Sequence, residues 1–249
     1  MSDTAQVNEF GQPIGARLPG WTAPPEPPKI AVHGRFCSVQ PLTLAEAPAL
    51  WDAYQRDADG RNWTYLPYGP FSDFQPFEQW IAQSIASTDP QFYVVNVHDG
   101  SADAGQMGVP AGVAAYLRIT PAMGVIEVGH IHFSPLLQHT PAATEAMYLM
   151  MRRVFELGYR RYEWKCDTLN APSRRAAERL GFSYEGIFRQ AIVTKGRNRD
   201  TAWYACVDQE WPALDAAYQH WLAASNFDEE GRQRESLSSL TDPILVARG

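Results

Sequence analysis

The segment from Glu127 to Gly186 constrains the fold more than any other part of the chain, because strand and helix patterns alternate in it twice. A predicted strand ends at Phe133 and a helix is predicted to begin at Thr140, after which the strand Arg161 to Cys166 leads to a second helix. Strands joined by helices can lie parallel, whereas short hairpins join antiparallel strands. The segment therefore predicts an α/β layer structure with a partly parallel sheet.

Both helices have start signals at defined residues. Thr140 is a favourable N-cap, and Pro141 suits the first helical position because no backbone donor is needed there. Asn170 is predicted to cap the second helix, and Gly181 to end it in left-handed geometry. The first helix should be buried along an apolar stripe formed by Met147, Met150, Val154 and Leu157.

Local patterns on either side of this segment extend the fold. Before it, a capping box at Thr43 to Glu46 precedes one helix, and another is predicted near Pro76 to Ser87. After it, a hairpin is predicted to turn at Lys195 to Asp200, and an amphipathic helix to cover Trp211 to Ala223. The strands are predicted at Arg35 to Leu42, Gln91 to His98, Val113 to Ile119, Val125 to Phe133 and Thr201 to Val207, with the Gly-rich stretch Asp99 to Gly112 as a long turn.

The same patterns divide the chain into three parts. Residues 1–33 contain the sequence PEPPK and several glycines, and we expect them to form an extended Pro-rich arm. Residues 34–208 hold the alternating strands and helices and form one domain. Residues 209–249 contribute a helix and a charged, serine-rich tail, which packs on the domain or trails from it.

Composition and charge argue against several classes of protein. The 249 residues contain no apolar run long enough to span a membrane and no start typical of a signal peptide, so we expect a cytoplasmic protein without membrane contact. A net charge of -7 disfavours nucleic acid as a partner. The three cysteines lie far apart without CxxC spacing, which argues against disulfides and a zinc site; they are Cys37, Cys166 and Cys206.

The start of the first helix is a candidate anion site. A helix leaves its first backbone amides without internal partners, and the positive end of its dipole lies beside them. We expect a pyrophosphate to bind there, on the amides of His139, Thr140, Ala142 and Ala143. The alternative is an ordinary capped helix without a ligand, and Asn170 is likewise open to interpretation as a cap alone.

The two helix starts carry a resemblance to a known family. Gln138 and Ala143 match the family's phosphate-binding motif, and Asn170, Ser173 and the Leu-Gly-Phe of residues 180–182 match its second motif. This part of the chain resembles the cofactor half of the GNAT superfamily of N-acetyltransferases, closest to the branch that acetylates the N-termini of ribosomal proteins. Pro141 departs from the pattern, because it stands where the family has its first glycine and removes one amide.

The resemblance implies a fold and a co-substrate. The implied fold is α/β and GNAT-like, with a mixed sheet of six to seven strands that splays after the fourth strand and helices on both faces. Acetyl-CoA is the implied co-substrate, and its pantetheine arm would pair with backbone groups that the splay frees. The cofactor-binding candidates are Phe133, Gln138, His139, Thr140, Ala142, Ala143, Asn170, Ser173 and, for the 3′-phosphate, Arg174.

Direct transfer of an acetyl group to an amine needs a base for the amine and a proton for the leaving thiolate. By resemblance, Glu127 is the first candidate for the base. His132 shares a predicted strand face with His130, so either imidazole is an alternative base, and Ser134 is a candidate donor to the thiolate or the oxyanion. No third ligand at suitable spacing accompanies the two histidines, so we expect no metal.

The acceptor site is expected on the loop between the first two helices. Trp63, Tyr65, Tyr68 and Phe71 crowd this loop, and they either form the wall of a pocket for a cationic amine or pin the loop to the core. Nearby carboxylates would attract a positive amine; they belong to Asp57, Asp59 and Asp73.

The sequence therefore predicts an acetyl-CoA-dependent N-acetyltransferase whose partner is a primary amine, either a peptide N-terminus or a small molecule. Two alternatives from other classes stay open. One is a CoA- or acyl-CoA-binding module that keeps the fold without transfer activity, which Pro141 suggests. The other is an interaction protein that binds partners through its terminal arms. A homodimer is compatible with the sequence.

Overall fold

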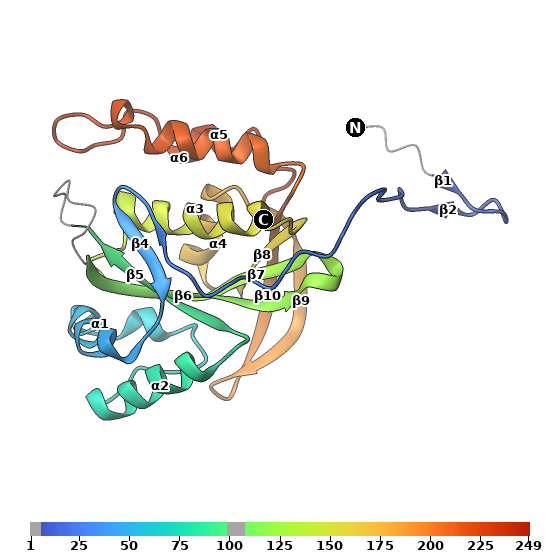
Figure 1. Ribbon diagram of the computed structural model, residues 1–249. Helices are drawn as coiled ribbons and strands as arrows, with labels where there is room; N and C mark the ends of the chain where they lie inside the picture. The colour runs from blue at the N-terminus through green and yellow to red at the C-terminus, as the bar shows by residue number, and fades with distance from the viewer. Residues whose placement is uncertain (1–5, 99–107) are drawn as a thin grey trace.

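A mixed eight-stranded sheet forms the centre of the molecule (Figure 1). The computed structural model describes residues 6–98 and 108–249. The strands lie in the order β3-β4-β5-β6-β7-β8-β10-β9, in which β7 and β8 pair in parallel and the other neighbours pair antiparallel. Their bounds are β3 Val32–His33, β4 Cys37–Pro41, β5 Gln91–Val97, β6 Val109–Thr120, β7 Val125–Phe133, β8 Arg161–Asp167, β9 Ser183–Thr194 and β10 Arg197–Val207.

Helices cover both faces of this sheet (Figure 1). They are α1 Ala47–Tyr54, α2 Phe74–Ala86, α3 Pro141–Glu156, α4 Ala171–Arg179, α5 Trp211–Leu222 and α6 Leu237–Thr241. One face carries α1 and α2, and the other carries α3 and α4, over which α5 and α6 pack. The predicted α/β fold is confirmed, with the two-residue β3 added at the edge of the sheet. In the described residues, no helix has the length and apolar character needed to cross a membrane.

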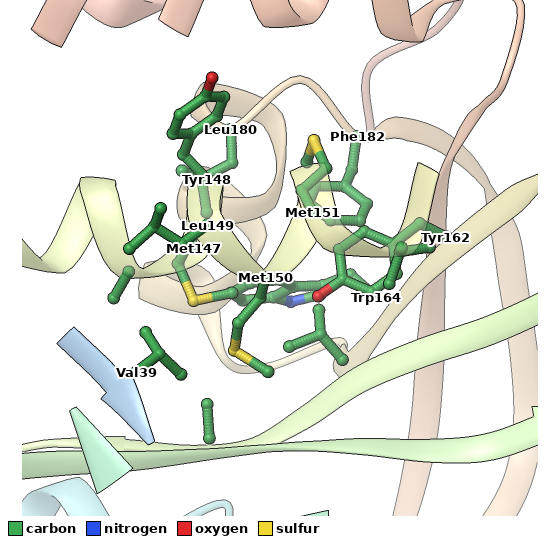
Figure 2. Close-up of a cluster of buried hydrophobic side chains, with 14 of the residues drawn as sticks. Val39, Met147, Tyr148, Leu149, Met150, Met151, Tyr162, Trp164, Leu180 and Phe182 are labelled. Atoms are coloured by element: carbon green, nitrogen blue, oxygen red, sulfur yellow. The ribbon is translucent and has the colours of Figure 1, made fainter. Parts of the chain in front are cut away.

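The α3 side of the sheet holds a large hydrophobic core (Figure 2). Met147 and Met150 of α3 lie above Val39 of β4, and Tyr162 and Trp164 of β8 belong to the same cluster. The predicted helical stripe is buried at Met147, Met150 and Val154, whereas Leu157 is half-buried at the C-cap. This packing holds the start of α3 beside the ends of β7 and β8.

A carboxylate adds a polar anchor to that core. Glu145 of α3 is buried, and its two oxygens accept hydrogen bonds from the backbone amides of Arg35, Phe36 and Cys37 at 2.8, 2.6 and 3.0 Å. A buried charge is tolerated when hydrogen bonds satisfy it. Glu145 thus ties α3 to the start of β4.

The parallel strands β7 and β8 separate part-way along their length. Their pairing ends at Val128 opposite Trp164, but β7 continues to Phe133 and β8 to Asp167. Residues 129–133 therefore have no pairing to β8, so backbone donors and acceptors on that side are available to a ligand. The expected splay after the fourth long strand, β7, is confirmed.

A β-bulge in β7 lies at the same place. His130 has a φ of 50°, and the register with β6 shifts beside it. One extra residue changes the alternation of side chains along a strand. Val128 packs into the α3 core, whereas His130 and His132 contact aromatic rings on the α1–α2 side. The two histidines share a face as predicted, and the bulge decides which face it is.

Two turns differ from the predictions. Residues 99–107 of the predicted turn Asp99 to Gly112 lie outside the described part of the chain. Residues 109–112 belong to β6 instead of the turn, and Gly112 pairs with both β5 and β7. The predicted hairpin turn Lys195 to Asp200 is too long. The turn is Lys195–Gly196, whose φ values of 49° and 72° suit a two-residue connection, so β10 begins directly afterwards.

The N-terminal arm is extended, and its two parts lie differently. A short hairpin of β1 (Gln6–Val7) and β2 (Pro13–Ile14) projects from the body of the molecule (Figure 1). Further along, Pro24 and Pro27 are buried, and Tyr159 Oη donates a hydrogen bond to the carbonyl of Pro25, which lies between them, at 3.1 Å. The second part of the arm therefore packs on the domain.

Candidate active site

Two cavities meet where β7 and β8 separate. The larger has a volume of about 970 Å³ and lies beside α3 and α4. The smaller, of about 440 Å³, lies among β6, β7, β8, β10 and the loop after α1. Their common lining residues are Asn62, Ile131, Trp164, Asn170 and Ser173. Ligands in the two cavities can therefore approach each other across the open part of the sheet.

The start of α3 lines the larger cavity, with fewer free amides than expected. Thr140 caps the helix, since its Oγ1 accepts a hydrogen bond from the Ala143 amide at 3.3 Å. The Thr140 amide itself donates to the Leu137 carbonyl at 3.3 Å. Of the four amides predicted to be free, those of His139 and Ala142 have no partner among the described residues. The prediction was therefore wrong for Thr140 and Ala143, whose amides close the turn and the cap.

Gln138 and Phe133 shape the neighbouring corner of the larger cavity. Both residues line it, and Gln138 Nε2 donates to the Phe133 carbonyl at 2.7 Å. This bond holds the loop before α3 against the end of β7. The amide group of Gln138 is thus engaged in shaping the cavity wall.

The start of α4 lies at the junction of the two cavities. Asn170 Oδ1 accepts a hydrogen bond from the Ser173 amide at 3.2 Å, which confirms the predicted cap. Ser173 Oγ accepts a second bond, from Trp164 Nε1, at 3.0 Å. Asn170 Nδ2 donates to no described residue. This amide group is therefore free to bind a ligand at the junction.

The basic side chain on α4 that faces the larger cavity is not the predicted one. Arg174 Nε donates to Tyr204 Oη at 3.2 Å and its Nη1 to the Thr168 carbonyl at 3.3 Å, so the guanidinium points away from this cavity. Arg175 and Arg179 line the cavity instead. Successive residues of a helix differ in direction by about 100°, and an error of one residue moves a side chain to another face.

The C-terminal segment forms one wall of the larger cavity. Trp221 of α5 packs edge-on against Phe227, with ring centroids 5.4 Å apart, and its Nε1 donates to Gln233 Oε1 at 2.8 Å. Sequence reasoning missed this wall, because it lies beyond the segment that carries the motifs and no motif marks it. The lining residues from this segment are Trp221, Phe227, Gly231, Arg232 and Gln233.

A buried ion-pair network crosses the floor of the smaller cavity. Glu127 Oε2 accepts hydrogen bonds from Arg118 Nη1 at 2.7 Å and from Lys165 Nζ at 2.8 Å, and Lys165 also pairs with Glu163 at 2.7 Å. The side chains of Glu127 and Lys165 are only 4% and 7% exposed. Lys165 Nζ lies 3.7 Å from the centre of the Trp203 ring. The two cations fix the orientation of Glu127, whose Oε1 has no hydrogen bond to a described residue.

His130 also lines the smaller cavity. Its Nδ1 lies 3.1 Å from Tyr68 Oη, and the two rings stack. Burial, followed by the charges of Arg118 and Arg199, lowers the pKa of His130 to about 4. The imidazole is therefore neutral at pH 7.

The other two candidates on β7 and after it are enclosed. The His132 ring is packed against Tyr54 and Trp63, at centroid distances of 4.0 and 3.7 Å, and burial lowers its pKa to about 3. Both ring nitrogens are buried and have no partner in the described structure. Ser134 is 0% exposed and lines neither cavity. His132 lines the larger cavity, but its ring nitrogens are buried by the packing against Tyr54 and Trp63. The catalytic roles predicted for His132 and Ser134 therefore gain no support from this geometry.

The aromatic loop is mostly a structural element. Trp63 and Tyr68 pack into the α1–α2 core, whereas Tyr65 lines the smaller cavity and donates through Oη to the Leu169 carbonyl at 3.0 Å. Of the three predicted substrate-binding aromatics, Tyr65 alone therefore lines this cavity. The nearby carboxylates bond locally to the backbone or to Arg61; they belong to Asp57, Asp59 and Asp73.

Metal ligands do not gather in the part of the chain that the structure describes, where no group of three or more His, Cys, Asp or Glu side chains could hold an ion. All three cysteines are buried thiols. Cys166 lines the smaller cavity, and burial raises its pKa, so the thiol stays protonated at pH 7.

Comparison with known protein families identifies the family of this chain. Residues 38–183 match the sequence model of the acetyltransferase (GNAT) domain, which is more than half of the chain. The chain belongs to the GNAT acetyltransferase family. The matched segment runs from β4 to the start of β9 and includes both helix starts at the cavity junction.

Solved GNAT structures resemble the chain over most of its length. A GCN5-related N-acetyltransferase from Brucella melitensis is 45% identical, with a TM-score of 0.85 over 90% of this chain and 100% of its own. A probable GNAT acetyltransferase from Chromobacterium violaceum is 41% identical, with a TM-score of 0.72 over 81% and 98%. The uncharacterized N-acetyltransferase YnaD of Bacillus subtilis is 30% identical over 86 residues, 34% of this chain, and the match spans half the length of that relative.

The predicted closeness to the ribosomal-protein branch is not supported. RimL, an acetyltransferase of ribosomal protein L7/L12, is 18% identical, with a TM-score of 0.58 over 70% of this chain and 91% of RimL. At this identity the likeness extends to the fold alone. The superfamily is confirmed, and the acceptor is not given by these relatives.

Proposed function

We propose that this protein is an acetyl-CoA-dependent N-acetyltransferase that transfers the acetyl group directly to a primary amine. The observation that carries the proposal is the meeting of the two cavities at the separation of β7 and β8. One cavity would hold the coenzyme and the other the amine. The junction would bring the thioester and the amine together without a covalent enzyme intermediate.

The residues of the larger cavity fit coenzyme A. Its volume of about 970 Å³ is in the range of ligand sites, and its walls offer anion donors in the His139 amide and in Arg175 and Arg179. The unpaired edge of β7 at residues 129–133 suits the amides of a pantetheine arm. Asn170 Nδ2 would donate to that arm at the junction.

Acetyl-CoA supplies the thioester carbonyl that the amine attacks. Glu127 Oε1 is positioned to take a proton from the incoming amine, directly or through one water, while Arg118 and Lys165 hold the carboxylate in place. The new C–N bond replaces the C–S bond, and the proton that Glu127 takes from the amine passes through solvent to the thiolate, so that coenzyme A leaves as the thiol. His130, neutral and facing the same cavity, is the second candidate for the base.

The size of the smaller cavity favours a compact acceptor. About 440 Å³ accommodates a small molecule or the first residue or two of a peptide, and no larger body. A folded protein would have to present a free N-terminus into it. We therefore place small-molecule amines ahead of protein N-termini as acceptors.

The test combines binding with turnover. Isothermal titration with acetyl-CoA and with CoA should show binding at micromolar to millimolar ligand, and thiol release from acetyl-CoA should rise when a panel of primary amines is added. Absence of binding would contradict the proposal. Binding without amine-dependent thiol release would also contradict it, in favour of a non-catalytic CoA-binding module.

A further inference from the structure

The charges around the smaller cavity are unequal. Among its lining residues, Arg118, Lys165 and Arg199 are cations, whereas Glu127 and Asp167 are anions. Lys165 is neutralised by its two carboxylate partners, and Glu127 also engages Arg118. Asp167 Oδ1 accepts a hydrogen bond from the Leu169 amide. Arg199 is the lining cation without an ion pair to any residue that the structure describes.

Arg199 has no ion pair or hydrogen bond to any residue that the structure describes, and its Nε is buried. It lies on β10 opposite Ile192. The neighbouring Asp200 does not pair with it, because its Oδ1 accepts bonds from the Gln190 amide at 2.7 Å and from Asn198 Nδ2 at 3.0 Å. A guanidinium in a cavity without a counter-charge is a binding group for an anion, since it can donate two parallel hydrogen bonds to a carboxylate or a phosphate.

Arg199 lies close to the place where the reaction would occur. It lines this cavity together with His130 of β7 and Cys166 of β8. The same cavity is lined by Asn170 and Ser173, which also line the larger cavity. An anion on Arg199 would therefore lie within a small molecule's length of an amine at the junction.

The remaining wall of the cavity is apolar. The rings of Phe188 and Trp203 pack against each other at a tilt, with centroids 4.3 Å apart, and together with Leu117 and Ile192 they line the side formed by β6, β9 and β10. The hairpin that carries these rings is tied across the cavity by Lys195 Nζ, which donates to the Trp63 carbonyl at 2.8 Å. Aromatic and aliphatic faces of this kind bury the apolar part of a ligand.

We infer that the acceptor is a small primary amine that also carries an anionic group, either carboxylate or phosphate, together with an apolar body. The inference rests on the proposed function. The amine lies at the junction near Glu127, the anion pairs with Arg199, and the apolar body packs on Trp203 and Phe188. Polyamines and amines without an anion are poor acceptors, because Arg199 would then remain unpaired beside a second positive charge.

Matched amines test this inference. Phenylalanine, its α-aminophosphonate analogue and 2-phenylethylamine share the amine and the ring, and differ in the anion. We expect kcat/KM for acetylation to be about 10- to 100-fold higher for the better of the two anionic amines than for 2-phenylethylamine. The comparison of carboxylate with phosphonate identifies which anion the site prefers.

Arg199→Gln should abolish this preference by raising KM for the anionic amine while leaving kcat and the Kd for CoA nearly unchanged. Arg197→Gln is the matched control, since Arg197 is exposed on the same strand and lines neither cavity. Equal acetylation of anionic and neutral amines, or an undiminished preference in Arg199→Gln, would overturn the inference and leave the proposed function standing. Failure of every amine would overturn the proposed function itself.

Discussion

Lys165 is the residue on which the buried network depends. It lies between Glu127 and Glu163, and its side chain is 7% exposed. Lys165→Met would leave two buried carboxylates without their shared cation, and removal of one partner of a buried ion pair costs about 3–5 kcal/mol. Urea unfolding at pH 7 should show a loss of this size in the free energy of unfolding. A loss below about 1 kcal/mol would contradict the role of this network.

The same substitution should change how stability depends on pH. Burial alone would raise the pKa of Glu163, but hydrogen bonds from Lys165 and then Arg161 outweigh it and hold this pKa below its ordinary value of 4.5. In the native protein, the stability from Glu163 is therefore present above that value and is lost as the pH falls through the lower folded-state pKa. In Lys165→Met, the hydrogen bond that lowers the pKa of Glu163 is lost while burial still raises this pKa, so the free energy of unfolding of the variant should rise between pH 7 and pH 5 as Glu163 takes up a proton. A flat or falling profile there would count against this account.

Glu127→Gln tests the proposed base. The variant keeps a side chain of the same size, and Lys165 keeps its ion pair with Glu163. Loss of a general base lowers kcat by about 100-fold or more. KM for acetyl-CoA should stay unchanged. An unaltered kcat would favour His130 as the base, because His130 lines the same cavity and its Nδ1 lies beside Tyr68 Oη.

Two adjacent arginines provide a matched pair. Arg175 lines the larger cavity, whereas Arg174 is bonded to Tyr204 and Thr168 outside it. Arg175→Ala should weaken CoA binding about 3- to 10-fold, as expected for loss of a charge-assisted contact, and Arg174→Ala should not. Titration calorimetry of both variants measures the difference. A larger loss of CoA affinity in Arg174→Ala than in Arg175→Ala would instead favour Arg174 as the residue that binds the 3′-phosphate, as predicted from the sequence.

At the scale of elements, the start of α3 departs most from its family. Pro141 removes an amide beside those of His139 and Ala142. Pro141→Ala restores that donor, and one hydrogen bond of about 1 kcal/mol would tighten CoA binding roughly fivefold. Pro212→Ala, at the start of α5 and away from both cavities, is the control. Unchanged or weaker binding in Pro141→Ala would show that phosphate does not use this position.

Helix starts were predictable because their signals are local. The caps at Thr140 and Asn170 follow from one residue and the three after it, and both are present. The bulge at His130 was not predictable in this way, because it depends on the register with β6, which is set by residues far away in the sequence. For the same reason, period-two spacing predicted a common face for His130 and His132 and could not show that His132 is enclosed by Tyr54 and Trp63.

At the scale of the whole molecule, the two parts of the N-terminal arm should contribute differently. Removal of residues 1–19 deletes the projecting hairpin and should leave the melting temperature unchanged within about 1 °C. Removal of residues 1–31 also deletes the contacts at Pro24 and Pro27, the Pro25 carbonyl and the Lys29 bond to Ser87. A loss of about 2 kcal/mol would lower the melting temperature by about 4–8 °C in a protein of this size. Equal melting temperatures would show that the arm is dispensable throughout.

The sequence could not predict which side chains from distant segments of the chain meet in the folded protein. Local patterns located the strands and the α4 cap, and the family resemblance implied the splay. The wall formed by Trp221 and Phe227, and the unmatched charge of Arg199, come from segments brought together only by the fold. Their roles depend on which side chains share a cavity, and periodicity does not contain that information.

The most direct test is a crystal structure of the protein with acetyl-CoA bound. The account predicts that the pyrophosphate lies at the start of α3, that the pantetheine arm runs along residues 129–133, and that the acetyl carbonyl lies at the junction beside Ile131, Asn170 and Ser173. An acetyl group outside this junction, or coenzyme bound away from the larger cavity, would contradict it.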